Sequence, residues 1–138
     1  MDRKIDIRKA AGVLLKDRKF LITRSRGKSF FIAPGGKLGD GESVSEALKR
    51  ELHEELQINV QTADLKKLGT FYALAAGHAD KRLQMDVLIV EKWDGEISPA
   101  AEVEEIMWVS SELPPSLELG SIFQHDVLPK LKSLDLID

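Results

Sequence analysis

Short apolar runs separated by polar or glycine-rich segments make up the first part of the chain. Residues 10–15 and 20–23 are two such runs with β-prone side chains, and the polar residues between them predict a hairpin. A third apolar run at residues 30–32 is stopped by the Pro-Gly-Gly sequence at residues 34–36, which is a strong backbone break. The pattern therefore predicts strands that lead into a glycine turn.

The pattern changes to a helical period after a second glycine turn at residues 39–41. Ser43 and Glu46 have the spacing of a capping box, which predicts a helix that begins at Ser43 and ends at about Leu56. Further strands are expected at about 67–75, 83–93 and 105–109, and a last helix at about 121–131, after a Pro-Pro break. This order predicts an α/β (α+β) fold, a mixed sheet with helices packed on it.

The helix predicted from Ser43 carries acidic residues beside its apolar stripe. With about 100° of rotation per residue and Val44 at zero, the apolar side chains span about 300° to 120°. Glu51, Glu54 and Glu55 fall at about 340°, 280° and 20°, on the edge of this stripe. Like charges three and four residues apart each cost roughly 0.2–0.5 kcal/mol. Arg50 points towards only one side of the cluster.

Two interpretations of this acidic rim remain open. It is either the charged surface of a soluble helix or a site for a cation. Clustered carboxylates that face a glycine-rich turn are suitable ligands for hard ions such as Mg²⁺ or Mn²⁺.

Composition restricts the possible partners. The chain has 138 residues, no Cys, and a formal net charge of −3, so it has no disulfides, no thiolate metal site and no general attraction for nucleic acid. A polyanionic ligand would therefore need local cations or a bound metal. The charged N-terminus and short apolar runs predict neither a secretory signal nor a membrane span. We expect a soluble cytoplasmic domain with no membrane or nucleic acid polymer as partner.

The glycine turn and the helix together carry a longer motif. It reads Gly36, five residues, Glu42, seven residues, and then RELHEELQI at residues 50–58. This closely resembles the Nudix box, G-x5-E-x7-R-E-U-x-E-E-x-G-U, where U is a bulky aliphatic residue. Every fixed position matches except the last glycine, which is Gln57 here. The preceding Pro34-Gly35 and the strand spacing resemble the small MutT-type members of the Nudix hydrolase superfamily.

The resemblance implies one Nudix hydrolase domain over residues 1–138, with the box at residues 36–58 and an α/β/α sandwich around a mixed β-sheet. It implies a metal-dependent hydrolase of nucleoside diphosphates linked to another moiety, using Mg²⁺ with Mn²⁺ as a possible substitute. The implied metal ligands are Glu51, Glu54, Glu55 and the backbone carbonyl of Gly35. The implied supporting residues are Gly36, Glu42 and Arg50.

The catalytic candidates combine the box with a loop outside it. Glu54 or another acidic residue would orient or deprotonate water, and Glu51 is a further candidate. Some members use a Glu from a later loop, and Glu102 lies six residues before Trp108, where the MutT-type pattern would place it. Glu104 and Glu105 are alternatives, and a role as solvated surface stays open for each of the three.

Substrate contacts are less well specified. For phosphate we nominate Arg24, where MutT-type members carry an Arg at the end of the second strand, with Lys37 and Arg26 as further candidates. A nucleobase could contact aromatic or His side chains that would otherwise belong to the core. These are Phe30, Phe71, Tyr72, His78 and Phe123.

Two departures from the family pattern have consequences. Gln57 replaces a glycine that ends the helix in a left-handed conformation, at a cost of roughly 1–2 kcal/mol. We expect an effect on helix termination and stability but not on metal binding, and Asn59 is an alternative site for the turn. After Pro114-Pro115 the chain reads Ser-Leu-Glu and lacks the Asn of MutT-type enzymes that favour oxidised guanine, which puts 8-oxo-guanine selectivity in doubt.

Three functions follow from the resemblance. The first is a Mg²⁺-dependent pyrophosphohydrolase that cleaves a nucleoside triphosphate, which can be a modified or oxidised one, to a monophosphate and diphosphate. The second is a hydrolase of ADP-ribose or dinucleoside polyphosphates. The third is a non-catalytic nucleotide-sensing domain, but such domains tend to lose box carboxylates and all four are present here. In each case the partner is a small nucleotide, and the oligomeric state is left open.

Overall fold

The computed structural model describes residues 4–75 and 78–138. Its strands are β1 (Ile7–Lys16), β2 (Lys19–Ser25), β3 (Gly35–Lys37), β4 (Leu65–Ala75), β5 (His78–Val90) and β6 (Val103–Val109). Its helical segments are α1 (Val44–Leu56), the 3₁₀ turn η1 (Thr62–Asp64), the π-helical η2 (Phe123–Val127) and α2 (Leu128–Ser133). In this part of the chain, no helix is long and apolar enough to cross a membrane.

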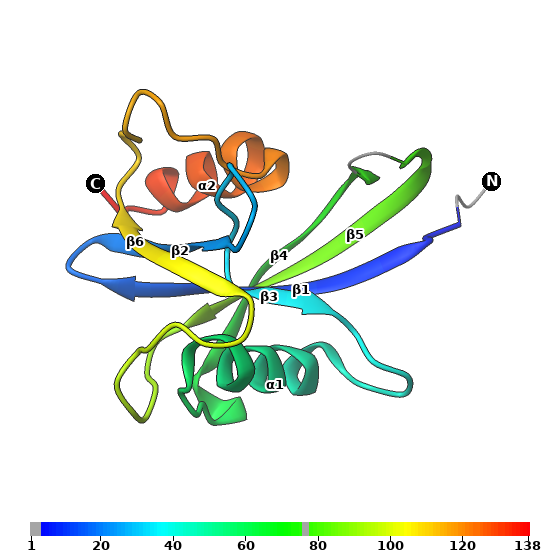
Figure 1. The fold of residues 1–138 in the computed structure, drawn as a ribbon, viewed down its shortest axis with the longest axis horizontal. Helices are drawn as coiled ribbons and strands as arrows, with labels where there is room; N and C mark the ends of the chain where they lie inside the picture. The colour runs from blue at the N-terminus through cyan, green and yellow to red at the C-terminus, as the bar shows by residue number, and fades with distance from the viewer. Residues whose placement is uncertain (1–3, 76–77) are drawn as a thin grey trace.

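The strands form one mixed sheet with a helical layer on each side. The strand order is β4-β5-β1-β2-β6, and β3 pairs with β1 off this path. β1 and β5 are parallel, whereas the other pairs are antiparallel. Figure 1 shows α1 on one side of the sheet and η2 with α2 on the other. This confirms the predicted α+β fold with a mixed sheet between helices.

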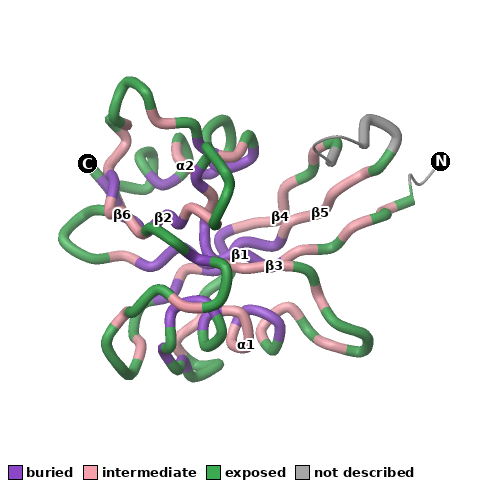
Figure 2. The backbone as a smooth tube through the Cα atoms, in the orientation of Figure 1, coloured by how far each residue is buried: buried purple, intermediate pink, exposed green. Residues whose placement is uncertain are grey.

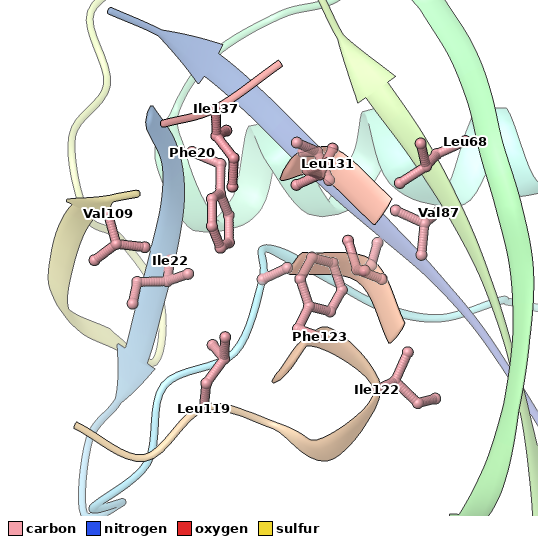
Figure 3. Close-up of a cluster of buried hydrophobic side chains, with 14 of the residues drawn as sticks. Phe20, Ile22, Leu68, Val87, Val109, Leu119, Ile122, Phe123, Leu131 and Ile137 are labelled. Carbon is pink, nitrogen blue, oxygen red and sulfur yellow. The ribbon is translucent and has the colours of Figure 1, made fainter. Parts of the chain in front are cut away.

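Each face of the sheet has its own hydrophobic core. Successive side chains of a strand point to opposite faces, so β1 contributes to both: Ala10 and Leu14 pack towards α1, whereas Ala11 and Val13 pack towards α2. The buried segments concentrate along the central strands and the inner faces of the helices (Figure 2). On the α2 side, Phe20 of β2 packs against Phe123 of η2, with their ring centroids 6.4 Å apart (Figure 3).

The predicted hairpin and α1 are confirmed, and two details of the prediction are wrong. Both bonds of the capping box are present: the Glu46 amide donates to Ser43 Oγ (3.1 Å), and the Ser43 amide donates to Glu46 Oε1 (3.2 Å). Gln57 itself takes the left-handed conformation, with φ 59° and ψ 32°, so the alternative at Asn59 is wrong. The last two residues of the break expected at 34–36 instead belong to a strand, β3.

Gly35 allows β3 to approach β1 closely. Gly35 has φ +147°, and a Cβ there would lie 2.1 Å from the backbone oxygen of Ala10. No side chain fits in that space, so glycine marks a close strand contact here.

The C-terminal helical segment follows the prediction in extent but contains a π-helical turn. The Leu128 amide donates to the Phe123 carbonyl, five residues earlier. Pro129 follows and has no amide hydrogen to continue an α-helical ladder through this turn.

Candidate functional site

The three glutamates of the acidic rim of α1 differ in how far they are buried. Glu55 is only 2% exposed, the Glu51 side chain is 14% exposed, and the Glu54 side chain is 50% exposed. The structure thus confirms that these side chains border the apolar stripe. Glu54 differs from the other two because it lies on the solvent side of the rim.

Arg50 connects the rim to the loop that precedes α1. Its guanidinium donates to both carboxylate oxygens of Glu42, each at 2.9 Å, and to the carbonyl of Lys37 at 3.2 Å. It also donates to Glu51 at 2.9 Å and to Glu54 at 3.4 Å. A bidentate charged pair of this kind fixes geometry strongly. Arg50 therefore holds Glu42, Glu51 and Glu54 in place.

Glu42 is stabilised as an anion by these contacts. Hydrogen bonds from Arg50, and then from the Gly39 amide at 2.7 Å, lower the pKa of Glu42 to about 2. The loop of residues 37–42 is thereby fastened to the helix.

Glu55 forms no ion pair with the cationic side chains that the structure describes. Its carboxylate accepts one hydrogen bond, 2.9 Å long, from the Gly35 amide. Burial above all, together with the charges of Glu51, Glu102 and Glu54, raises the pKa of Glu55 to about 8 against the opposing effect of that bond. Burial also raises the pKa of Glu51, against the effect of Arg50. When all three of its carboxylates are ionised, the rim therefore carries more negative charge than Arg50 compensates.

Gly36 makes the contact between β3 and this rim possible. A Cβ at Gly36 would lie 2.6 Å from Oε1 of Glu51. The carboxylate therefore lies directly against the backbone of β3.

The acidic loop before β6 contributes one carboxylate to the rim. Glu102 acts electrostatically on both Glu51 and Glu55. The loop is attached to α1 by the Ala100 amide, which donates to the Glu55 carbonyl at 2.8 Å, and Ala101 has a left-handed φ of 53°. Of the three acidic alternatives, the structure thus brings Glu102 towards the site.

The other two acidic alternatives, Glu104 and Glu105, lie in β6 and pair with Arg24. Arg24 Nε lies 3.0 Å from Glu105 and its Nη2 lies 3.5 Å from Glu104. Arg24 also donates to the carbonyl of Lys28 at 3.1 Å. The nominated phosphate contact is therefore engaged with carboxylates, and it is not among the residues that line the neighbouring cavity.

A cavity of about 530 Å³ adjoins the site on the α2 side of the sheet. Gly35 and Gly36 form part of its wall, which places it next to β3. Most of the remaining wall is apolar, including Phe30, Met85 and Phe123. A hollow of this size and lining is typical of a small-molecule site.

Of the residues proposed for nucleobase contact, the structure places two at the cavity and others away from it. Phe30 and Phe123 line the cavity. Phe71 instead lies under Lys130, whose Nζ is 5.7 Å from the ring centroid, and Tyr72 is exposed. The side chain of His78 lies outside the described residues.

Lys37, which the sequence analysis nominated as a phosphate contact, lines this cavity, and so do Lys9 and Lys28, which it did not nominate. The strand period offers a signal for Lys9, since it shares a face of β1 with Ala11 and Val13. Nothing in the sequence pattern singles out Lys28.

The oxygen donors of the rim fit a hard divalent cation. Two of the three carboxylates are largely buried and their negative charge is incompletely compensated, which a cation would offset. In the described residues, however, no three His, Cys, Asp or Glu side chains are gathered closely enough to hold an ion as they stand. In this arrangement Arg50 forms ion pairs with Glu51 and Glu54.

Comparison with known proteins supplies a family. The sequence matches the NUDIX domain over residues 6–131. It is 32% identical over 127 residues to an 8-oxo-dGTP diphosphatase of Haemophilus influenzae, covering 84% of this chain and 88% of that protein. It is 29% identical over 96 residues to the uncharacterized Nudix hydrolase YvcI of Bacillus subtilis, covering 70% of this chain. That match spans only 61% of the Bacillus protein.

Solved structures share the fold. The solution structure of the E. coli ORF135 protein has a TM-score of 0.76 at 23% identity and covers 93% of this chain and 89% of that one. The crystal structure of a MutT NUDIX hydrolase from Burkholderia pseudomallei has a TM-score of 0.69 at 20% identity and covers 94% and 95%.

Proposed function

Because the chain belongs to the Nudix hydrolase family, whose members act on nucleotide diphosphate bonds and generally use a divalent metal, we propose that it is a Mg²⁺-dependent pyrophosphohydrolase of nucleoside triphosphates. The reaction adds one water across the bond between the α- and β-phosphates and yields a nucleoside monophosphate and diphosphate. The observation that carries the proposal is the position of β3, which lies against Glu51 and also forms a wall of the cavity.

The proposed metal ligands are Glu51, Glu54, Glu55 and the carbonyl of Gly35. When bound, the ion supplies charge neutralisation at the phosphates and a lowered pKa of bound water. The buried positions of Glu51 and Glu55 support their role as ligands, since the charge that they bury lacks a full counterpart.

Glu54 is the proposed base. Its half-exposed carboxylate gives water access, and its bond to Arg50 limits its orientation. From that position it would orient the attacking water and accept its proton. Glu102 is a second carboxylate that acts on the same cluster. Arg50 and Glu42 are positioning residues, because they connect the ligand-bearing helix to its loop.

The proposed substrate is a nucleoside triphosphate without selectivity for oxidised guanine. The Haemophilus influenzae relative is named an 8-oxo-dGTP diphosphatase, but this chain has no Asn after Pro114-Pro115. Of the described residues that line the cavity, none is Asn, Gln, Asp or Glu, so no side-chain amide or carboxylate reads a guanine edge there. We expect 8-oxo-dGTP and dGTP to have similar kcat/KM.

A substrate panel tests the proposal. Canonical triphosphates, 8-oxo-dGTP, ADP-ribose and a dinucleoside polyphosphate are incubated with Mg²⁺, and phosphate and diphosphate are measured separately. Diphosphate release from triphosphates is the expected result. Release of phosphate alone, preference for ADP-ribose or dinucleoside polyphosphates, or tight binding without turnover would each contradict it.

Glu54→Gln tests the assigned base. Loss of the proton acceptor should lower kcat by roughly 10²–10⁴-fold while the fold survives. Glu96→Gln is the matched control, because Glu96 is exposed and far along the chain from the box. A Glu54→Gln variant with nearly full activity would show that the base lies elsewhere.

A further inference from the structure

Two lysines face each other across the β1–β3 pair. Lys9 and Lys37 are register partners in this antiparallel pair, so their side chains leave the same face of the sheet, with Cβ atoms typically about 4.5–5.5 Å apart. Like charges in this position are unfavourable. Both residues line the cavity, and we propose that they form a subsite for an oxyanion, a phosphate group of the nucleotide.

Among the side chains that the structure describes, no ion pair joins either lysine to a carboxylate. Of the described residues in the cavity wall, none is acidic. Lys9 is half-buried, and burial followed by the charge of Lys37 lowers its pKa. By contrast, the exposed Lys66 lies 2.9 Å from Glu91.

The position of the pair identifies which ligand it would meet. In β3, Gly36 faces Glu51 on the α1 side, and Lys37 points to the opposite face because strand neighbours alternate. The cavity reaches Gly35 and Gly36, so one ligand can contact both the lysine pair and the end of the sheet near the acidic rim. The identification of this ligand as a nucleotide rests on the proposed function.

The chemistry of the wall favours a phosphate over a neutral group. Each ammonium offers three hydrogen-bond donors and no acceptor, and two together match the charge of a phosphate. The apolar side chains beside them, such as Phe30 and Phe123, suit the organic part of a nucleoside monophosphate. Lys28 lines the same cavity and adds a third positive charge.

Binding to the metal-free protein tests the subsite without requiring turnover. Calorimetric titrations in the presence of chelator compare a nucleoside monophosphate, the uncharged nucleoside and inorganic phosphate. The monophosphate should bind at least about tenfold more tightly than the nucleoside. Inorganic phosphate that binds as tightly as the monophosphate would assign the site to the free ion, and equal affinity for nucleoside and monophosphate would overturn the subsite.

Substitution of each lysine then locates the contact. Lys9→Met and Lys37→Met should each weaken monophosphate binding by about tenfold, while Lys9→Arg retains most of it. The double variant should lose less than the product of the two single losses, since both side chains contact one group. Lys66→Met, on β4, is the matched control and should bind as the wild type does.

The outcomes separate this inference from the proposed function. If the panel shows diphosphate release but Lys9→Met keeps its Kd and KM, the subsite is wrong and the function stands. If no triphosphate is cleaved but Lys9→Met loses monophosphate binding, the subsite stands and the function is wrong. Thermal melting excludes misfolding, because loss of the like charge at Lys9 should leave the Tm equal or higher.

Discussion

The buried carboxylate of Glu55 should make the metal-free protein less stable as pH rises. The pKa of Glu55 is about 8 in the folded chain, above its ordinary value of 4.5 in the unfolded chain. The folded state therefore binds more protons than the unfolded state between these two values. Its contribution to stability is fully present below about pH 4.5 and is lost as pH rises through about 8.

The size of the effect follows from the same two pKa values. Between pH 5 and pH 8 the free energy of unfolding should fall by about 3 kcal/mol from this group. Glu51 contributes in the same direction, because burial raises its pKa too. Glu42 acts outside this window: its pKa of about 2 means that its stabilisation is lost only as pH falls from about 4.5 towards 2.

Urea unfolding at pH 5 and pH 8, with chelator present, measures this dependence. Glu55→Gln keeps an oxygen that accepts the Gly35 amide but has no charge, so it should be more stable than the wild type at pH 8 and have a flatter pH dependence. Added Mg²⁺ should stabilise the wild type at pH 8 far more than this variant. Glu96→Gln, at an exposed site, is the control. If the wild type and Glu55→Gln show the same change between pH 5 and pH 8, the buried charge has no such cost.

Two further substitutions test the helix end and the β3 contact. Gln57→Gly relieves a left-handed φ of 59°, so unfolding should cost about 0.5–1 kcal/mol more, as the lost strain exceeds the added chain entropy. A calorimetric Tm that falls, or a collapse of activity, would contradict this. Gly36→Ala places a methyl group 2.6 Å from Oε1 of Glu51; the flexible carboxylate should move, so the Tm changes little while kcat falls by about tenfold or more. Unchanged kcat with normal folding would show that the position of Glu51 is not critical.

The sequence alone predicts α1 and the position of its acidic rim, because both depend on the spacing of residues close together in the chain. The Ser43–Glu46 capping box sets the start of the helix, and the helical period alone places Glu51 and Glu55 beside the apolar stripe. The periodic argument also explains why Glu54 is more exposed, since at about 280° it lies furthest from the centre of the stripe. No tertiary contact is needed for these conclusions.

The remaining features depend on contacts between distant segments. In the sequence, the glycines of β3 predict a backbone break. These residues form a strand only because they pair with β1. Glu102 lies near the rim because the Ala100 amide bonds to the Glu55 carbonyl and so attaches its loop to α1. The spacing from Trp108 suggests Glu102 as a candidate but cannot establish this contact. The cavity depends on where the π-helical η2 packs against the sheet. Such contacts override local propensity.

The three-residue strand β3 contacts an acidic group on one face and carries a basic group on the other. Its sequence is Gly-Gly-Lys, and the two-residue period of a strand sends neighbouring positions to opposite faces. Gly36 therefore meets the carboxylate of Glu51 on one face, while Lys37 meets Lys9 on the other. A turn at these residues would not impose that alternation. If one nucleotide contacts both groups, its negatively charged phosphates lie at the end of β3, between a cation-binding rim and a lysine pair, and the strand conformation fixes that division.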